Sequence, residues 1–325
     1  MLNVNDYVPA NAGRDVSDEI QKLIDENPNR TLHFGDGTYL LKKTVLTPAD
    51  PEKSVDLRLD TYAVFAADEG FEKGPLVALG GKNAANNVRI PGSNYGFTGG
   101  ILDGRGIADG IHIVSGRETA IRDVSMKNVV TGIYIRYGAN NGSSDADITG
   151  VNIIGNRTKD SCGIVIDAYD NSVTNVRIGG IHTGVKLLRG GNTLRNVHPL
   201  YYMGEEYESS TGFIDDHGNN FYSYCYSDQF ATGWLIGNGG ASVLTDCVAF
   251  WYTGKGGVET ALRAEKQYNA LVHNMKIGFS QDTVNTVLTE GEAGGRGRIT
   301  NLLSDESRFG SDETWKKYFD GSVVG

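Results

Sequence analysis

Acidic, basic and aromatic side chains gather in the middle of this 325-residue chain, where they could carry out acid–base chemistry on a polar polymer. Asp167, Asp215 and Asp216 supply carboxylates, and two suitably spaced carboxyl groups can act as general acid and general base. Arg, Lys and His can donate hydrogen bonds to hydroxyl or carboxylate groups, and Tyr and Trp rings can pack on sugar faces. The candidate binding residues are Tyr134, Arg136, Lys186, Arg189, Tyr202, His217, Asp228 and Trp251.

The elements that must position these side chains are defined by a repeated pattern of glycine, apolar residue, any residue and apolar residue. The copies begin at Gly110, Gly132, Gly163, Gly184, Gly212 and Gly233, with a weaker copy at Gly257. A second repeated position, once per coil, has a polar residue followed by an apolar one. Its copies are Asp123-Val124, Asn175-Val176, Asn196-Val197, Asp246-Cys247, Asn274-Met275 and Asn301-Leu302. Short alternating segments are typical of strands, and their recurrence at roughly 20–30 residues predicts a parallel β-solenoid. Asp123 and Asp246 are then interpreted as structural members of a side-chain ladder.

Both ends of the chain are interpreted as caps of this solenoid. Residues 15–24 carry an apolar stripe at helical spacing, and Asn27-Pro28 ends it, which predicts an amphipathic helix ahead of the coils. Residues 312–319 predict a short closing helix. We expect a single domain over residues 1–325. Its parts are an N-terminal strand and capping helix (1–48), repeating coils (85–305) and a C-terminal closing segment (306–325).

Composition excludes several classes of protein. The 44 glycines with only 7 prolines fit a fold with many tight turns. A net charge of −10 argues against a nucleic-acid partner, and the absence of a long apolar run argues against a membrane partner. Three cysteines make no disulfide framework, and the six histidines show no metal-ligand spacing, so no metal site is predicted. The start of the chain is not a signal peptide, which leaves a cytoplasmic protein or a secreted one whose signal has been removed.

Alternation along each strand sorts the side chains into inward and outward sets. Residues one and three after each glycine should face inward, and residues two and four should face outward. The outward columns are His112, Tyr134, Val165, Lys186, Ile214, Leu235 and Glu259, and Val114, Arg136, Asp167, Leu188, Asp216, Gly237 and Ala261. Ionisable residues concentrate in the middle coils, as expected of a substrate cleft; ordinary pairing of surface charges is the alternative.

The spacing of the carboxylates indicates a mechanism. Asp167 and Asp216 are two coils apart in one column, on the order of 9–10 Å at ~4.8 Å per coil. Inverting glycosidases hold their two carboxyl groups ~6.5–9.5 Å apart, so this pair suits inversion. Asp215 should face inward, and a buried carboxyl group tends to keep its proton, as a general acid requires. The alternative is a bulge or strand end that leaves Asp215 exposed.

An insertion between Pro199 and Thr211 interrupts the repeat just before the Asp215-Asp216 coil. Insertions in solenoids cluster on one face, often the binding face. The aromatic candidates for stacking on sugars are Tyr202, Tyr207, Trp251 and Tyr252, and the alternative is packing of the insertion onto the coil. Asp228 is a spare carboxylate on the neighbouring turn.

The opening of the chain resembles the start of the pectate-lyase-like right-handed parallel β-helix superfamily. The resemblance rests on a short strand at Asn3-Val4-Asn5-Asp6-Tyr7, the capping helix and the segment from Leu32 to Leu40, and it extends to residues 85–305 through the repeat. It implies an all-β, single-stranded right-handed parallel β-helix. This superfamily includes polygalacturonase-type glycoside hydrolases, polysaccharide lyases and phage tailspikes. Asp215-Asp216 resembles the Asp-Asp element of the hydrolases, but His217-Gly218 follows it directly, and the Asn-x-Asp and Arg-x-Lys elements are absent.

These observations predict a glycoside hydrolase that uses an aspartate pair, with inversion, on a polysaccharide or oligosaccharide and without a cofactor. One alternative is a lyase, in which Arg136 or Lys186 abstracts a proton beside a uronic carboxylate and calcium neutralises that carboxylate. The other is a non-catalytic, tailspike-like glycan-binding module. The chain is expected to be a monomer or a homotrimer.

Overall fold

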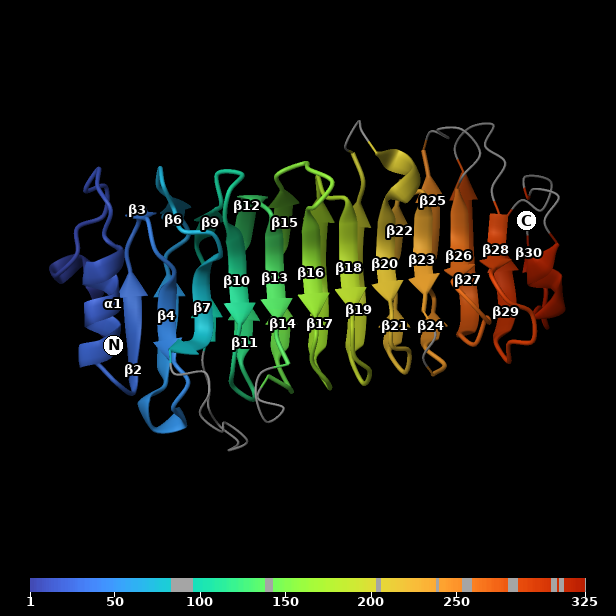
Figure 1. Cartoon of the computed structure of the whole chain (residues 1–325), viewed down its shortest axis with the longest axis horizontal. Helices are drawn as coiled ribbons and strands as arrows, with labels where there is room; N and C mark the ends of the chain where they lie inside the picture. The colour runs from blue at the N-terminus through green and yellow to red at the C-terminus, as the bar shows by residue number, and fades with distance from the viewer. Residues whose placement is uncertain are drawn as a thin grey trace. The chain divides into compact units, whose positions relative to one another are not determined.

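The computed structural model describes residues 1–82, 96–137, 143–202, 206–237, 240–252, 259–279, 286–304, 309 and 313–324. The chain divides into two units. Unit 1 comprises Met1–Asn156 and Gly163–Val176, and unit 2 comprises Arg157–Cys162 and Arg177–Gly325. Each unit is built from short parallel strands that return coil after coil to the same sheets (Figure 1). The described part of the chain contains no helix long and apolar enough to span a membrane.

Unit 1 begins with the capping elements. These are β1 (Leu2–Asn3), η1 (Val4–Asp6) and α1 (Ser17–Glu26). The coils comprise β2 (Arg30–Phe34), β3 (Gly37–Leu41), β4 (Val45–Pro48), η2 (Pro51–Lys53), β5 (Val55–Leu59), β6 (Ala63–Ala67), β7 (Pro75–Lys82), β8 (Gly96–Thr98), β9 (Ile101–Asp103), β10 (Asp109–Ile113), β11 (Ala120–Arg122), β12 (Ser125–Val129), β13 (Thr131–Ile135), β14 (Asp147–Thr149) and β15 (Asn152–Gly155). Strands β16 (Cys162–Ile166) and β17 (Ser172–Gly179) lie where the chain passes between the sequence ranges of the two units.

The predicted capping helix is confirmed, with Ile20, Leu23 and Ile24 buried on its inner face. The strand expected over residues 3–7 is wrong in extent. Strand β1 ends at Asn3, because the Asn3 side chain accepts a hydrogen bond from the Asn5 backbone N–H and starts the 3-10 turn η1.

Unit 2 comprises β18 (Thr183–Leu187), β19 (Thr193–Leu200), η3 (Tyr207–Ser209), β20 (Thr211–Asp215), β21 (Phe221–Ser223), β22 (Tyr226–Asp228), β23 (Thr232–Ile236), β24 (Val243–Thr245), β25 (Val248–Trp251), β26 (Thr260–Ala264), β27 (Leu271–Phe279), β28 (Thr286–Glu290), β29 (Arg298–Leu303), η5 (Thr314–Lys317) and β30 (Val323–Val324). One sheet runs β18-β20-β23-β26-β28 in register. The closing helix expected at residues 312–319 is the short 3-10 helix η5, with Trp315 buried.

The core of unit 2 is a stack of matching side chains. Val185, Phe213, Trp234, Leu262 and Leu288 pair in register on successive coils, and all five are 0% exposed. The rings of Phe213 and Trp234 stack in parallel, with centroids 4.8 Å apart. This separation matches the ~4.8 Å spacing of neighbouring strands.

The repeated glycine has a steric reason. A Cβ atom on Gly184 would lie 2.3 Å from the Gly212 carbonyl oxygen on the next coil, and one on Gly233 would lie 2.6 Å from the Ala261 carbonyl oxygen. At Gly184 it would also lie 2.5 Å from the Cβ of Pro199 on the opposing sheet. The glycine therefore makes room for the backbone of the neighbouring coil, while the apolar residue that follows it packs in the core. This arrangement explains why the pattern repeats as Thr-Gly-apolar in β18, β20 and β23.

The weak copy of the repeat at Gly257 is wrong in register. Gly257 and Val258 lie outside the described residues, but Trp234 pairs with Leu262 and Leu235 pairs with Arg263. Ala261 therefore takes the place of the glycine. Glu259 and Ala261, expected on the outward columns, are 1% and 0% exposed, and Arg263 and Glu265 take their positions.

Candidate functional site

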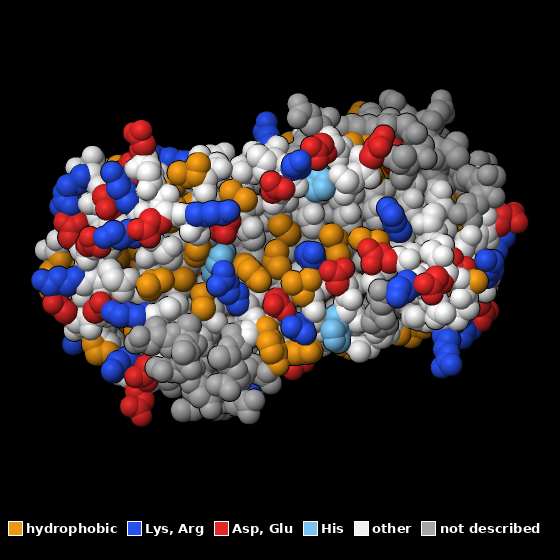
Figure 2. Space-filling view, in the orientation of Figure 1, with side chains coloured by type: hydrophobic (Ala, Val, Ile, Leu, Met, Phe, Trp, Pro, Cys, Tyr) orange, Lys and Arg blue, Asp and Glu red, His pale blue; other side chains and the backbone are white. Residues whose placement is uncertain are grey.

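A polar cleft of about 550 Å³ lies on the outward side of β23, β26 and β28 in unit 2. Its lining residues are Glu208, Thr232, Thr260, Arg263, Ala264, Glu265, Thr289, Glu290 and Gly291. Figure 2 shows the face that carries these strands, with acidic and basic side chains interspersed among uncharged ones. The cleft combines hydroxyl groups, one guanidinium group and three carboxyl groups, which suits a ligand rich in hydroxyl groups.

The strand register places the cleft residues in columns that continue beyond the cleft onto β18 and β20. One column is all threonine: Thr183, Thr211, Thr232, Thr260 and Thr286. The next contains Lys186, Ile214, Leu235, Arg263 and Thr289. Two residues further on, the third contains Leu188, Asp216, Gly237, Glu265 and Gly291.

Asp216 and Glu265 face outward from the third column on either side of Gly237. Backbone hydrogen bonds fix this column, because Asp216, Gly237 and Glu265 each donate an N–H to the preceding coil at 2.7–3.1 Å. Both acidic residues are exposed. Two coils correspond to roughly 9–10 Å between the two backbones. Gly237 places no side chain between the two carboxylates, and a Cβ atom there would lie 2.7 Å from the Cα atom of Asp216.

A lysine accompanies Asp216. The Nζ atom of Lys186 lies 3.6 Å from Oδ2 of Asp216, and the two side chains are 39% and 37% exposed. These two residues, predicted as a binding cation and a catalytic carboxylate, therefore lie together on adjacent coils. For Glu265, the described residues provide no ion-pair partner.

Glu208 is presented to the cleft by the insertion. It lies in η3, next to Tyr207, which is buried and donates its hydroxyl to Oε1 of Glu259 at 3.2 Å. Burial, followed by the charge of Glu259, raises the pKa of Tyr207 well above its ordinary value. The Ser210 hydroxyl donates to the Tyr207 carbonyl at 2.6 Å, which secures the turn. The alternative interpretation of Tyr207, packing onto the coil, is confirmed.

Glu290 lies at the floor of the cleft, with only 6% of its side chain exposed. Its carboxylate accepts the Tyr318 hydroxyl and lies 3.3 Å from Lys317 Nζ. Partial burial, together with this bond to Glu290, raises the pKa of Tyr318 to about 12. The C-terminal helix η5 and the residue after it thus anchor this side of the cleft.

Asp215 faces inward, as strict alternation predicted, and the alternative of an exposed position is wrong. It is 0% exposed and accepts four hydrogen bonds. The donors are Gly218 N at 2.7 Å, Asn220 Nδ2 at 2.9 Å, Tyr222 Oη at 3.0 Å and Ser242 Oγ at 2.6 Å. Its carboxylate therefore lies out of reach of a surface ligand and holds the turn after β20 in place. We correct its assignment from general acid to structural residue.

Trp251 is also corrected. Its ring is 1% exposed, and its Nε1 donates to the Phe230 carbonyl at 2.7 Å, because alternation in β25 turns this side chain into the core. Tyr202 is 41% exposed, with the Arg157 guanidinium 5.1 Å from its ring centroid. Tyr252 is 61% exposed.

The other predicted binding residues of unit 2 lie on different parts of its surface. Arg189 and His217 are half-buried near the ends of β18 and β20, and His217 Nδ1 lies 3.1 Å from the Gly218 carbonyl oxygen. Asp228 belongs to another sheet, where its Oδ2 lies 3.3 Å from His198 Nε2. The His198 ring stacks on Tyr226 with centroids 4.2 Å apart. Asp228 therefore belongs to a His–Tyr–Asp cluster outside the cleft.

Three predicted site residues belong to unit 1. Tyr134 is half-buried and Arg136 is exposed, with the Arg136 guanidinium 5.3 Å from the Tyr134 ring centroid. His112, expected at the surface, is 4% exposed and lies 2.9 Å from an Asp109 carboxylate oxygen. Asp167 follows β16 and donates its N–H to the Ile135 carbonyl. Because Asp216 belongs to unit 2, the pairing of Asp167 with Asp216 stays a prediction.

Glu208, Arg263 and Glu265 were missed by the sequence analysis, although signals existed for each. A threonine precedes the glycine of the repeat at positions 183, 211 and 232, and Thr260 continues this series. Aligning Thr260 with these threonines gives the correct register of β26. Glu208 lies within the insertion that was recognised, but only the aromatic residues there were considered.

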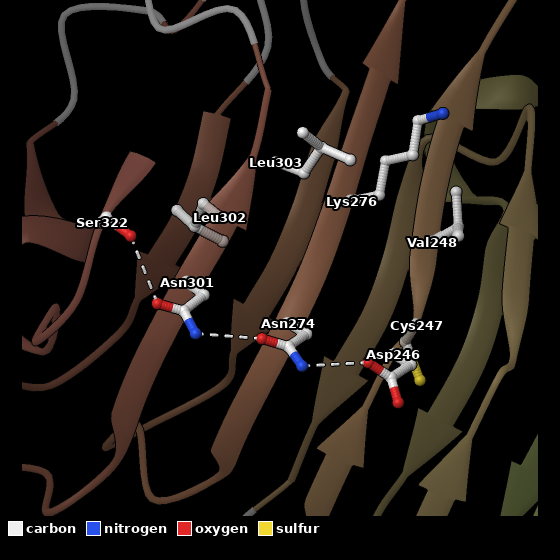
Figure 3. Close-up of a pocket in the computed structure, with 9 residues that line it drawn as sticks. All are labelled: Asp246, Cys247, Val248, Asn274, Lys276, Asn301, Leu302, Leu303 and Ser322. Atoms are coloured by element: carbon white, nitrogen blue, oxygen red, sulfur yellow. Dashed lines mark hydrogen bonds between the residues drawn. The ribbon is translucent and has the colours of Figure 1, made fainter. Parts of the chain in front are cut away.

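A second groove, of about 560 Å³, lies elsewhere on unit 2 (Figure 3). A ladder of side chains runs along it: Ser322 donates to Asn301 at 3.4 Å, Asn301 to Asn274 at 3.0 Å and Asn274 to Asp246 at 3.1 Å. Asp246, Asn274 and Asn301 all have φ between 53° and 57°, the left-handed region that Asn and Asp tolerate. The ladder interpretation of Asp246 is thereby confirmed.

Comparison with known proteins identifies the architecture. No family model and no curated protein matches the sequence. The structure is similar to the tailspike protein of E. coli bacteriophage HK620 in complex with a pentasaccharide, with a TM-score of 0.67, 11% identity and coverage of 100% of this chain and 67% of that chain. A mutant of that tailspike with a pentasaccharide gives a TM-score of 0.69 at 10% identity, covering 100% and 66%. A second mutant, with a hexasaccharide, gives 0.63 at 12% identity, covering 94% and 65%.

The chain is a right-handed parallel β-helix. The fold predicted from the repeat, and from the resemblance to the superfamily that includes phage tailspikes, is confirmed. At 10–12% identity, the similarity concerns the fold of the β-helix and not its chemistry.

Proposed function

We propose that this β-helix binds a glycan in the cleft of unit 2 and hydrolyses a glycosidic bond with Asp216 and Glu265 as its pair of carboxylates. The observation that carries the proposal is that these two residues occupy one outward column with Gly237 between them. The roughly 9–10 Å separation of their backbones suits the ~6.5–9.5 Å between carboxyl groups that inverting glycosidases use.

The surroundings of the two carboxylates suggest their roles. Lys186 places a positive charge beside Asp216, which suits a general base that activates water. Glu265 lines the cleft without an ion-pair partner among the described residues, which suits a general acid that protonates the leaving oxygen. Both residues reach solvent, so a glycan lying across Gly237 can contact the two groups at once.

The remaining cleft residues would bind the sugar. Arg263 and Glu208 supply a donor and an acceptor, and the hydroxyl of half-buried Thr289 can do both. The tailspike structures with bound pentasaccharide and hexasaccharide support a glycan as the ligand class for this fold. A homotrimer or a monomer remains our expectation for the assembly.

The proposal is tested by screening the wild-type protein against neutral and uronic-acid polysaccharides, following both reducing ends and ultraviolet absorbance. Asp216→Asn and Glu265→Gln should reduce the release of reducing ends by orders of magnitude, whereas Asp167→Asn, at the carboxylate of the pair predicted from sequence, should leave it intact. Loss of cleavage in Asp167→Asn but not in Glu265→Gln would favour Asp167 and Asp216, the pair predicted from sequence. An ultraviolet-absorbing product that disappears with a chelator would establish the lyase. Glycan binding without any cleavage would establish the non-catalytic module.

A further inference from the structure

We propose that the groove of Figure 3 is a second glycan-binding site, which holds a linear chain of uncharged sugars without cleaving it. Its lining residues are Asp246, Cys247, Val248, Asn274, Lys276, Asn301, Leu302, Leu303 and Ser322. They come from β25, β27, β29 and the turns beside them, a different sheet from that of the cleft. The site thus extends the proposed function by a separate binding surface.

The ladder gives the groove a polar side with unused hydrogen-bonding capacity. Each Asn amide has two N–H donors and a carbonyl oxygen with two lone pairs. The ladder uses one N–H of Asn274 and one of Asn301, and a single acceptor bond at each carbonyl. Donors and acceptors are therefore presented side by side on successive coils. Sugar hydroxyl groups, which donate and accept, match this arrangement.

The spacing of the groove favours a glycan over a peptide. The amides recur with the coils, at ~4.8 Å. A linked pyranose ring advances a glycan chain by a comparable distance. An extended peptide repeats its side-chain direction every two residues, about 6.6 Å at ~3.3 Å per residue. This repeat is longer than the ~4.8 Å between coils, so equivalent peptide groups no longer face equivalent amides after two coils. A linear glycan can therefore make the same contact on each coil.

The walls of the groove are suited to the apolar faces of sugar rings. Val248 is half-buried and Leu303 is 47% exposed, and they stand apart along the groove with Lys276 between them (Figure 3). Val248, Lys276 and Leu303 follow one column, because Val248 pairs with Lys276 and Lys276 with Leu303. One lysine and one aspartate line the groove, so their formal charges offset each other and favour an uncharged ligand.

The same lining explains why the groove would bind without hydrolysis. Asp246 is its single carboxyl group, and one of its oxygens already accepts the Asn274 amide. Hydrolysis of a glycoside by either stereochemical course uses two carboxyl groups. The groove therefore lacks the second carboxyl group and can serve to hold the polymer.

The experiment is calorimetric titration of the Glu265→Gln protein, in which cleavage is blocked, with purified neutral oligosaccharides. We expect two binding events per chain. Leu303→Arg fills the end of the groove with a long charged side chain and should remove one of them. Leu271→Arg is the matched control, because Leu271 is 42% exposed on β27 outside the groove, and it should keep both. Circular dichroism melts establish that each variant is folded.

Val248→Arg, at the other end of the groove, provides a second blocking variant if Leu303→Arg does not fold. A single binding event that neither arginine changes would overturn the second site, and so would the absence of any binding. The wild-type cleavage assay reports separately on the cleft. Loss of cleavage with two intact binding events in the titration would refute the proposed hydrolase while leaving the groove in place.

Discussion

Lys186 and Asp216 form an ion pair between adjacent coils of unit 2, with Nζ 3.6 Å from Oδ2. Both side chains are more than a third exposed, so the pair contributes little to folding, on the order of 0–1 kcal/mol. The proposed function gives Lys186 a role beside the catalytic carboxylate that can therefore be tested separately from stability.

Lys186→Gln is therefore expected to leave the melting temperature almost unchanged and to lower kcat/KM. In the proposed function, a hydrogen bond from the Lys186 ammonium group to the bound ligand would be worth ~1.5–3 kcal/mol, so its removal corresponds to roughly a ten- to hundredfold loss of kcat/KM. Steady-state kinetics on the substrate found in the polysaccharide screen, together with thermal melts, measure both quantities. Lys266→Gln, an exposed lysine on the next turn after Glu265, is the control. A drop of several degrees in melting temperature without a kinetic effect would contradict this view of Lys186.

Glu265→Gln and Asp216→Asn should each reduce kcat by ~10²–10⁴, the range that general acid–base catalysis supplies. Glycan binding should persist, since both substitutions preserve shape and hydrogen-bonding groups. Departure of a poor leaving group depends most on protonation by the general acid. A glycoside with an activated leaving group should therefore recover much of its hydrolysis rate only in the variant that lacks the general acid. We expect that variant to be Glu265→Gln. Recovery in Asp216→Asn instead would exchange the two roles.

The architecture could be predicted because in-register stacking forces the same residue type to recur at each coil. The glycine that meets Pro199 in β18 and the left-handed Asn274 and Asn301 are such residues. The site was only partly predictable, because a single substitution of Ala261 for the expected glycine displaced the register and hid Arg263 and Glu265.

Side-chain burial was the second limit on prediction. A tryptophan beside a loop insertion suits either a sugar platform or a core, and only the register of β25 decides that Trp251 is core. Asp215 was placed correctly by alternation, but its four donors come from the turn after β20, from Tyr222 in β21 and from Ser242 on the next coil. Such a network depends on turn geometry that a repeat pattern does not encode.

Asp215→Ala should be strongly destabilising. It removes the acceptor of four hydrogen bonds and leaves buried donors at Asn220, Tyr222 and Ser242 without their partner. The cost should be several kcal/mol, since each buried donor left unsatisfied costs about 1–3 kcal/mol. Denaturant unfolding followed by circular dichroism measures it. Asp216→Ala, one residue along but exposed, should cost less than about 1 kcal/mol. Equal costs at the two positions would contradict the structural role of Asp215.

Tyr226 makes stability dependent on alkaline pH. Partial burial, followed by the charge of Asp228, raises its pKa to about 12. In the unfolded chain this phenol ionises near pH ~10. The contribution of Tyr226 to the free energy of unfolding is therefore complete below that pH and is lost as the pH rises to about 12. Melting temperatures of the wild type should therefore fall across this window, and Tyr226→Phe should reduce the slope. Tyr62→Phe, at a 70% exposed tyrosine, should leave the slope unchanged.

Tyr207→Phe tests whether the insertion positions Glu208 over the cleft. The substitution removes the hydroxyl that donates to buried Glu259 at 3.2 Å, at a cost of about 1–3 kcal/mol. If the bond positions η3, the loss should appear mainly as a higher KM, because Glu208 contacts the ligand rather than the scissile bond. Glu208→Gln should raise KM in the same way with the melting temperature intact, and the double variant should add little to either single change. Additive effects of the two substitutions would show that Tyr207 stabilises the unit without positioning Glu208.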